Sequence, residues 1–193
     1  MMKNKIKLGA YLFPMPVVLI GANVHGKPNF EALAYTGIVE SAPPMISISS
    51  YESHYTNIGI KENGTFSVNT PTEGMIEILD YCGIYSGKEV NKSELFDVFY
   101  GELNNAPMIM HSPLNLECKV MRIINTKDIS GAEEGHEIFI GQIISAYADD
   151  FYLVDEKPDI TKLNPILYSS KKYWKLSNSI ANAFSIGNNY KKQ

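Results

Sequence analysis

The chain has 193 residues, with 17 Lys and Arg against 21 Asp and Glu, which gives a formal net charge of −4. Because nucleic-acid binders usually carry a basic surface, this charge argues against nucleic acid as a main partner. Hydrophobic residues make up 45% of the chain and only two residues are cysteines, so we expect a packed core and exclude a disulfide scaffold. At roughly 150 residues per domain, the length favours a single domain over residues 1–193.

The N-terminal region has some features of a secretion signal but fits a buried strand better. Three lysines precede an apolar run over residues 8–22, which is shorter than the roughly 20 residues of a membrane span. Pro14 and Pro16 lie within the run and would break a helix. We therefore predict a buried strand over residues 17–22, and a cytoplasmic protein without membrane attachment.

Short strands separated by turn residues are predicted in the first half of the chain. A polar Gly/Pro connection covers residues 22–29, and apolar and polar residues alternate over residues 45–50. Asn63-Gly64 is a strong turn signal before the next strand. The expected strands cover residues 17–22, 32–39, 45–50 and 66–69, with one helical turn over residues 55–61.

The middle of the chain is predicted to be helical, and the second half returns to strands. Apolar residues recur at three- and four-residue spacing over residues 75–81, and a second short helix is expected over residues 89–99. Further strands are expected over residues 108–110, 116–124 and 136–147, followed by an aromatic-rich amphipathic segment over residues 165–189. Mostly antiparallel strands with two helices between them indicate a mainly β fold, a β-barrel with helical insertions.

The segment from Gly83 to Glu89 resembles a P-loop only in part. A P-loop has four residues between its glycines and Ser or Thr after its lysine, whereas this segment has three residues and then Glu89. Ser86, Gly87 and Lys88 still form a donor-rich turn, which suits a phosphate or another polar group, although most such turns are simple loops.

The histidines and cysteines do not form a metal-binding motif. The four histidines are scattered, and the segment that begins at His136 lacks the second histidine of a zinc helix. Cys82 and Cys118 are predicted to be buried core thiols. A Cys/His nucleophile pair remains open, because its members need only meet in space.

Three segments contain more small or polar residues than a plain core requires. Ala34, Thr36 and Gly37 lie along a predicted strand, where small residues let a flat ligand approach the backbone. His136 opens the last long strand, and Gly141 within it indicates a bulge or a close contact. A cluster of hydroxyls with one imidazole suits a phosphate monoester, and it consists of Ser47, Ser49, Ser50, Tyr51, Ser53, His54, Tyr55 and Thr56.

Several segments together resemble the flavin reductase-like, FMN-binding split-barrel family and, within it, the flavoredoxins. They occur in the family's order and span residues 14–186. The resemblance implies a six-stranded Greek-key split β-barrel, a homodimer, and one FMN per subunit near the dimer interface. The segments are residues 16–19, 29–30, 34–37, 42–49, 53–58, 62–69 and 80–88, then Pro107, Leu116-Glu117-Cys118 and Gly135-His136 with Gly141.

The same resemblance implies roles for individual residues. The residues expected to face the isoalloxazine ring or its edge are Asn29, Ala34, Tyr35, Thr36 and Gly37. Those expected around the ribityl phosphate are Ser47, Ser49, Ser50, His54, Tyr55 and Thr56, with Tyr51 in the same segment. Those expected elsewhere around the pocket are Asn69, Cys82, Ser86, Gly87 and Lys88. His136 matches a Gly-Asp-His-x-x-x-x-Gly strand near the approach of nicotinamide or substrate, but Gly135 stands where the family has Asp, which leaves this histidine without that carboxylate.

The resemblance implies an NAD(P)H:flavin oxidoreductase that passes electrons through FMN to an acceptor that the sequence does not identify. His136 would then orient the donor or the acceptor. Because the flavin carries the chemistry, no acid–base dyad is needed in the protein. Two alternatives remain: an FMN-binding electron carrier reduced by a protein donor, and a non-flavin barrel that binds a partner or another planar ligand. The small residues Ala34 and Gly37 argue against the second alternative.

Overall fold

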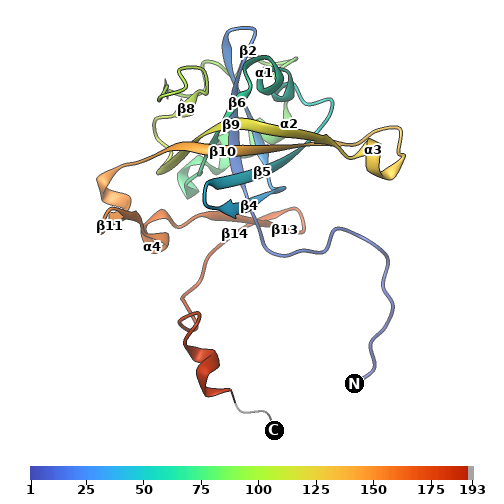
Figure 1. Cartoon of the computed structure of the whole chain (residues 1–193), viewed down its shortest axis with the longest axis vertical. Helices are drawn as coiled ribbons and strands as arrows, with labels where there is room; N and C mark the ends of the chain where they lie inside the picture. The colour runs from blue at the N-terminus through green and yellow to red at the C-terminus, as the bar shows by residue number, and fades with distance from the viewer. Residues whose placement is uncertain (191–193) are drawn as a thin grey trace.

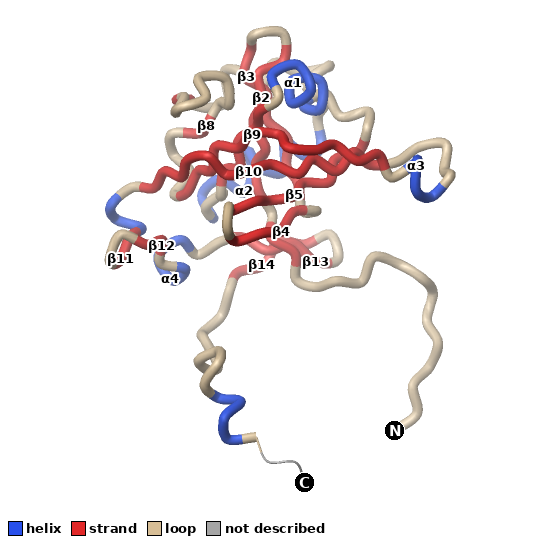
Figure 2. Tube along the Cα trace, viewed as in Figure 1, coloured by secondary structure: helices blue, strands red, loops and turns tan. Residues whose placement is uncertain are grey.

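The computed structural model describes residues 1–190, and most of its regular structure is β-strand (Figures 1 and 2). Seven strands form its main sheet: β2 (Val18–Val24), β3 (Lys27–Leu33), β4 (Thr36–Ser41), β5 (Pro44–Tyr51), β6 (Thr65–Asn69), β9 (Leu114–Asn125) and β10 (His136–Ala148). Their order is β3-β2-β6-β9-β10-β5-β4, and every pair is antiparallel. The edge strands β3 and β4 follow each other in sequence, so the sheet curls back on itself. This confirms the predicted Greek-key split β-barrel.

Shorter elements cover the ends of the barrel. β1 (Met15–Pro16), β13 (Ile166–Ser169) and β14 (Lys172–Lys175) form a small sheet, and two further pairs are β7 (Val98–Phe99) with β8 (Met108–Ile109) and β11 (Leu153–Val154) with β12 (Lys157–Pro158). The helices are α1 (Thr56–Asn63), α2 (Ile76–Ile84), α3 (Lys127–Ser130) and α4 (Ile160–Leu163), and single 3-10 turns cover Glu73–Met75, Asp150–Tyr152 and Ile186–Asn189.

The core explains why the first strand is a continuous apolar run. Ile20 on β2 packs inside the barrel with Phe66 and Phe139, whereas Leu19 packs on the other face with Phe30 under α2. Because alternate residues of a strand point to opposite faces, a strand buried on both faces needs apolar residues at every position. The prediction for residues 17–22 is therefore confirmed.

Gly141 lies where the barrel interior allows no side chain. The ladder between β9 and β10 shifts register between Ile140 and Gly141, and a Cβ on Gly141 would lie 2.6 Å from the ring of Phe66. The glycine therefore provides both the bulge and the close approach that the sequence indicated.

The predicted connection over residues 22–29 is wrong, and the predicted strand over residues 32–39 is interrupted at Ala34-Tyr35. The chain instead forms a hairpin of β2 and β3, then turns at Ala34-Tyr35 into β4. His25 and Gly26 both have positive φ, of 49° and 78°, which is the geometry of a two-residue hairpin turn. The polar residues Asn29 and Glu31 are tolerated on β3 because their buried side chains have hydrogen-bond partners, so composition alone did not indicate the strand. The main sheet thus gains a seventh strand beyond the six that the resemblance implies.

Two further expectations are also wrong. No helix forms over residues 89–99; the side chain of Asn91 accepts hydrogen bonds from the backbone N–H and hydroxyl of Ser93 instead, which holds a turn. The tail over residues 165–189 is not one amphipathic segment. It folds into the β13–β14 hairpin, whose turn at Ser170-Lys171 has positive φ, and then runs on as irregular chain to the last 3-10 turn.

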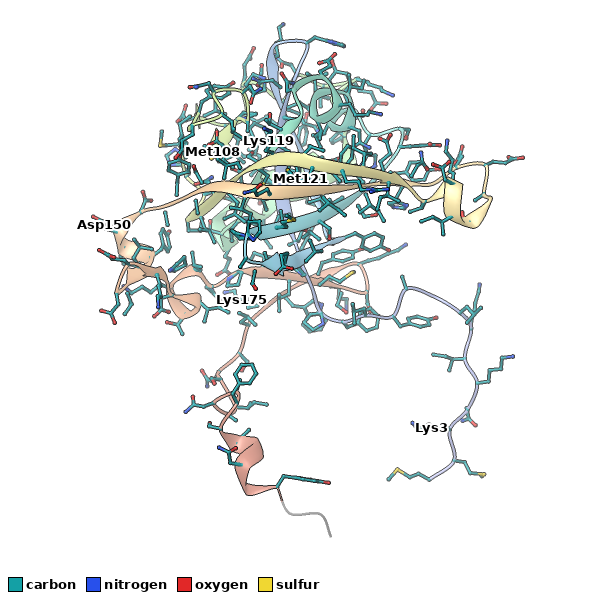
Figure 3. All side chains as sticks on the ribbon, viewed as in Figure 1. Lys3, Met108, Lys119, Met121, Asp150 and Lys175 are labelled. Carbon is teal, nitrogen blue, oxygen red and sulfur yellow. The ribbon has the colours of Figure 1, made fainter. Side chains whose placement is uncertain are left out.

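The two ends of the chain extend away from the barrel on the side of β14 (Figure 1). Lys3 lies on the N-terminal segment, well away from the packed side chains of the barrel (Figure 3). Several apolar side chains of both ends are exposed, and Leu12 and Phe184 are examples. No helix among residues 1–190 is long and apolar enough to cross a membrane.

Candidate functional site

An apolar cavity of about 620 Å³ lies on the outer face of β4 and β5. Ser47 and Ser49 point into it, whereas their neighbours Ile46 and Ile48 point into the barrel core. A Cβ on Gly37 would meet no atom within 4 Å, so the cavity floor at this point is bare backbone. The cavity is lined by Ala10, Tyr11, Leu12, Met15, Ala34, Tyr35, Thr36, Gly37, Ile38, Val39, Ser47, Ser49 and Ile138.

A row of aromatic rings leads away from this cavity. His136 lies opposite Tyr51 in the β5–β10 ladder, and their ring centroids are 5.4 Å apart. The His136 ring is also 5.7 Å from the ring of Tyr35, and Tyr51 is 6.2 Å from His54. The Tyr51 hydroxyl donates a hydrogen bond to Glu134, which raises the pKa of Tyr51. Glu134, the carboxylate that lies just before β10, therefore accepts its hydrogen bond from Tyr51 and not from His136.

A polar cavity of about 160 Å³ lies at the other end of the aromatic row. It opens between the end of β3, the start of α1 and the turn after α2. Its lining is Glu31, Ala32, Ser53, His54, Tyr55, Thr56, Cys82, Gly83, Ile84, Tyr85, Ser86, Gly87 and Lys92. A neighbouring hollow of about 440 Å³ shares Tyr55, Gly87 and Lys92 with it and adds Asn29 and Lys88.

Lys92 supplies a buried cation to the polar cavity. Only 3% of its surface is exposed, and its ammonium donates hydrogen bonds to the carbonyls of Phe30 and Cys82, each at 2.9 Å. Burial lowers the pKa of Lys92, and the nearby Glu31 carboxylate acts in the opposite direction. An ammonium carries three N–H donors, so two bonds fix its position and leave one donor for a ligand.

His54 supplies a second cationic group. Its Nδ1 atom lies 2.8 Å from the Glu31 carboxylate and 3.1 Å from the Ser50 hydroxyl, which itself donates to Glu31 at 3.0 Å. The hydrogen bond to Glu31 raises the pKa of His54, although partial burial and the charges of Lys92 and Lys88 oppose the shift. Exposed Lys88 adds a third positive charge at the rim, where it donates to the carbonyl of Ser53.

Gly87 fits tightly against the wall of this cavity. A Cβ at Gly87 would lie 2.2 Å from Asn29 Oδ1 and 2.5 Å from Tyr55 Cδ1. Asn29 cannot move aside easily, because it is buried and its amide donates to the Thr56 hydroxyl at 2.8 Å. Glycine therefore lets the turn after α2 lie directly on β3 and on the start of α1.

Cys82 lines the polar cavity as a thiol. The residue is only 3% exposed, and burial raises the pKa of its thiol to about 11. Cys118 is fully buried in the barrel, and its pKa is raised for the same reason. Both predictions of core thiols are confirmed, and at neutral pH Cys82 is not the thiolate of a Cys/His pair.

The structure brings most of the predicted site residues to these cavities. Ala34, Tyr35, Thr36, Gly37, Ser47 and Ser49 line the apolar cavity, and His54, Tyr55, Thr56, Cys82, Ser86, Gly87, Lys88 and Asn29 line the polar ones. Tyr51 and His136 lie between them. Ser50 is buried behind His54. Asn69 lies elsewhere: it is fully buried and bonds to the carbonyl of Leu19, the backbone N–H of Ile109 and the amide of Asn115.

The structure adds several lining residues that were not predicted from the sequence, and Glu31 and Lys92 are the charged ones among them in the polar cavity. Glu31 follows Asn29 at two-residue spacing on β3, a polar pattern within a strand that could have indicated it. No sequence feature indicated that Lys92 belongs to the site, because the pattern around it favoured a helix. Its partners are the backbone carbonyls of Cys82, 10 positions away, and of Phe30, 62 positions away, and no local pattern reveals them.

The chain belongs to the flavin reductase like domain family, whose model matches residues 10–177. This confirms the family resemblance. Among solved structures, it is similar to the flavoredoxin from Methanosarcina acetivorans, with 44% identity over 97% of this chain and 98% of that chain and a TM-score of 0.90. It is also similar to the flavoredoxin of Desulfovibrio vulgaris (Miyazaki F), with 31% identity over 96% and 100% of the two chains and a TM-score of 0.85. An FMN-binding protein from Thermus thermophilus, 17% identical over 94% and 100% with a TM-score of 0.77, shares the fold.

Proposed function

We propose that this protein binds FMN and acts as an oxidoreductase that passes electrons from NAD(P)H through the flavin to an acceptor. One observation carries the proposal: an apolar cavity with bare backbone at Gly37 and a cationic cavity lie at the two ends of one aromatic row. The 44% identity to a flavoredoxin supports the proposal that the protein binds a flavin.

The donor set of each cavity fits one part of FMN. The apolar cavity of about 620 Å³ lies within the range of roughly 300–1,000 Å³ that small-molecule sites occupy, and its small residues suit a planar ring. Lys92, Lys88 and His54 suit the phosphate, because charge-assisted hydrogen bonds to an anion are the strong ones. The residues that would hold the ring are Ala34, Tyr35, Thr36, Gly37, Ser47 and Ser49, and those that would hold the phosphate are His54, Tyr55, Thr56, Ser86, Gly87, Lys88 and Lys92.

Bound FMN would supply the redox chemistry, accepting a hydride equivalent from the nicotinamide and passing electrons on. The protein would contribute position and electrostatics. The backbone from Ala34 to Gly37 and the hydroxyls of Ser47 and Ser49 would orient the ring. His136, between Tyr35 and Tyr51, lies beside the apolar cavity, where it would orient the donor or the acceptor.

The visible absorption spectrum of the purified protein tests the cofactor. We expect the two bands of oxidised flavin, or quenching of FMN fluorescence on titration of a colourless preparation. A protein that shows neither would contradict the proposal. Stopped-flow mixing with NADH and NADPH then tests the donor. Reduction by either supports the oxidoreductase, whereas a protein that holds FMN but is reduced by neither is the electron carrier with a protein donor.

Gly37→Phe is expected to abolish binding of both FMN and riboflavin while leaving the fold intact. The new ring would project from a strand into the apolar cavity, where a Cβ meets no atom within 4 Å. Fluorescence titration with both flavins and a thermal melt check this prediction. Gly74→Ala, at a glycine away from the cavities, is the control. Undiminished riboflavin affinity in Gly37→Phe would show that the ring binds elsewhere.

His136→Ala is expected to slow reduction of bound FMN by NAD(P)H while FMN still binds. The imidazole lies beside the apolar cavity but does not line the polar one, so its loss should affect the approach of the donor more than the affinity for the phosphate. A fall of roughly tenfold to a hundredfold in the reduction rate is expected for loss of a positioning contact. Unchanged stopped-flow kinetics would refute this role.

The proposal includes a homodimer. Exposed apolar side chains on both ends of the chain and on β4 support it, since isolated extended segments with such residues gain stability by burial against a partner. Size-exclusion chromatography with light scattering should give twice the 21.6 kDa of one chain, and a monomer would contradict this part.

A further inference from the structure

Glu31 is the buried carboxylate of the polar cavity, and its geometry determines which nitrogen of His54 can donate a hydrogen bond to an anion. Its two oxygens accept from two different groups, Oε1 from the Ser50 hydroxyl at 3.0 Å and Oε2 from His54 Nδ1 at 2.8 Å. A carboxylate only accepts hydrogen bonds, so the proton of the neutral His54 ring lies on Nδ1. The ring's other nitrogen, Nε2, then carries no proton and can only accept.

This tautomer has a consequence for an anionic ligand. His54 lines the polar cavity and is 44% exposed at its side chain. A phosphate dianion has only acceptor oxygens, so the neutral His54 ring has no N–H to offer it through Nε2. The imidazolium has a second N–H and a positive charge, and it satisfies the carboxylate and the phosphate at the same time.

We propose that Glu31 is a positioning residue that fixes the His54 proton on Nδ1, so that binding of a phosphate-bearing flavin takes up one proton at His54. This inference rests on the proposed function, because it concerns the phosphate end of the same ligand. Riboflavin, which lacks the phosphate, binds without proton uptake. FMN affinity therefore falls as pH rises through the pKa of His54, and riboflavin affinity does not.

The charged groups around His54 agree with this direction. Glu31 on β3 favours the imidazolium, whereas Lys92 and Lys88 of the segment after α2 oppose it, and the balance raises the pKa of His54. Ser50 on β5 donates to Glu31, so it supports the same arrangement. A phosphate dianion entering the cavity adds negative charge and raises the pKa of His54 further, which is the thermodynamic source of the proton uptake.

Glu137 provides a matched control at the same end of the barrel. This second carboxylate is also almost buried, lies opposite Ser50 in the β5–β10 ladder, and bonds to Asn57 and Lys61 but not to His54. Glu137→Gln therefore removes a comparable buried charge without touching the tautomer of His54.

The test is isothermal titration calorimetry of the full chain with FMN and with riboflavin at pH 8, in two buffers of different ionisation heat. At this pH the free phosphate is a dianion, because its second pKa is about 6. We expect FMN to bind with uptake of up to one proton in the wild type and in Glu137→Gln, and riboflavin with none. In Glu31→Gln, the new amide can donate to Nδ1, so the neutral His54 ring can carry its proton on Nε2 and donate it to the phosphate. Proton uptake should then disappear at pH 8. Glu31→Asp keeps a carboxylate and should retain part of the uptake.

The outcomes separate this inference from the proposed function. If neither flavin binds, the proposed function fails. If both bind with equal proton counts, or if Glu31→Gln takes up as many protons as the wild type, only the inference fails. A readout that needs no variant is the ¹⁵N NMR spectrum of the neutral imidazoles. It should show His54 protonated on Nδ1, and an Nε2-protonated ring would overturn the proposal even if Glu31→Gln did not fold.

Discussion

Replacement of Lys92 by Met is expected to weaken FMN binding at least tenfold and to lower stability by about 1–3 kcal/mol. The ammonium donates to the carbonyls of Phe30 and Cys82 from a site that is only 3% exposed, and hydrogen bonds to charged groups each contribute about 1.5–3 kcal/mol. Removing the cost of burying the charge offsets part of that loss. The affinity change reflects the lost cation, since about 1.4 kcal/mol corresponds to a factor of ten.

Fluorescence titration with FMN and riboflavin, together with thermal unfolding of the flavin-free protein, checks this prediction. Riboflavin affinity should change little, because the cation faces the phosphate end. Lys61→Met is the matched control: Lys61 pairs with the nearly buried Glu137 at 3.0 Å but lines neither cavity. It should lower stability without changing FMN affinity. If Lys92→Met lost only stability, Lys92 would be a purely structural tie between β3 and the segment after α2.

Replacement of Gly87 by Ala is expected to lower both stability and FMN affinity. The added methyl group would overlap Asn29 and Tyr55, at 2.2 Å and 2.5 Å from its Cβ, so the turn after α2 must move outward. Overpacking of this kind typically costs about 1–3 kcal/mol, and for a chain of this length each kcal/mol lowers the melting temperature by about 2–4 °C.

The displaced turn carries Ser86 and Lys88, so the phosphate end of the site should open and FMN affinity should fall by about tenfold or more. A thermal melt and an FMN titration measure the two effects. Gly74→Ala is the control, since its Cβ would meet only the Thr72 hydroxyl, at 3.8 Å. Wild-type values for Gly87→Ala would mean that the close packing of this turn plays no part in the site.

Where the residues of one segment alone decide its conformation, the sequence pattern predicted the correct element. The alternation over residues 45–50 corresponds to β5, with Ile46 and Ile48 in the core and Ser47 and Ser49 outside. The apolar run over residues 17–22 corresponds to β2, which is buried on both faces. Where partners outside the segment decide the conformation, as in β3 or in the turn around Lys92, local composition favoured the wrong element.

The site residues also divide into those that local patterns indicated and those that depend on distant partners. The sequence indicated the small residues Ala34 and Gly37, the hydroxyl cluster around His54 and the turn at Ser86-Gly87, and the structure places the small residues, the turn and most of the cluster at the cavities. It could not indicate that Glu31 holds His54, 23 positions away, or that Lys92 anchors to Phe30. Asn69 was assigned to the pocket by resemblance and instead ties β6 to β8 and β9.

The sequence by itself determined the fold class, the family resemblance and the segments that form the cavity walls, because hydrophobic periodicity and turn residues act over a few positions. Only the tertiary structure decided which side chains meet and what charge they carry. The charge of His54 and of Lys92 depends on burial and on Glu31, and both arise only when β3, α1 and the turn after α2 pack together. The net charge of −4 argued against a basic surface, yet the fold gathers His54, Lys88 and Lys92 around the polar cavity and the hollow beside it.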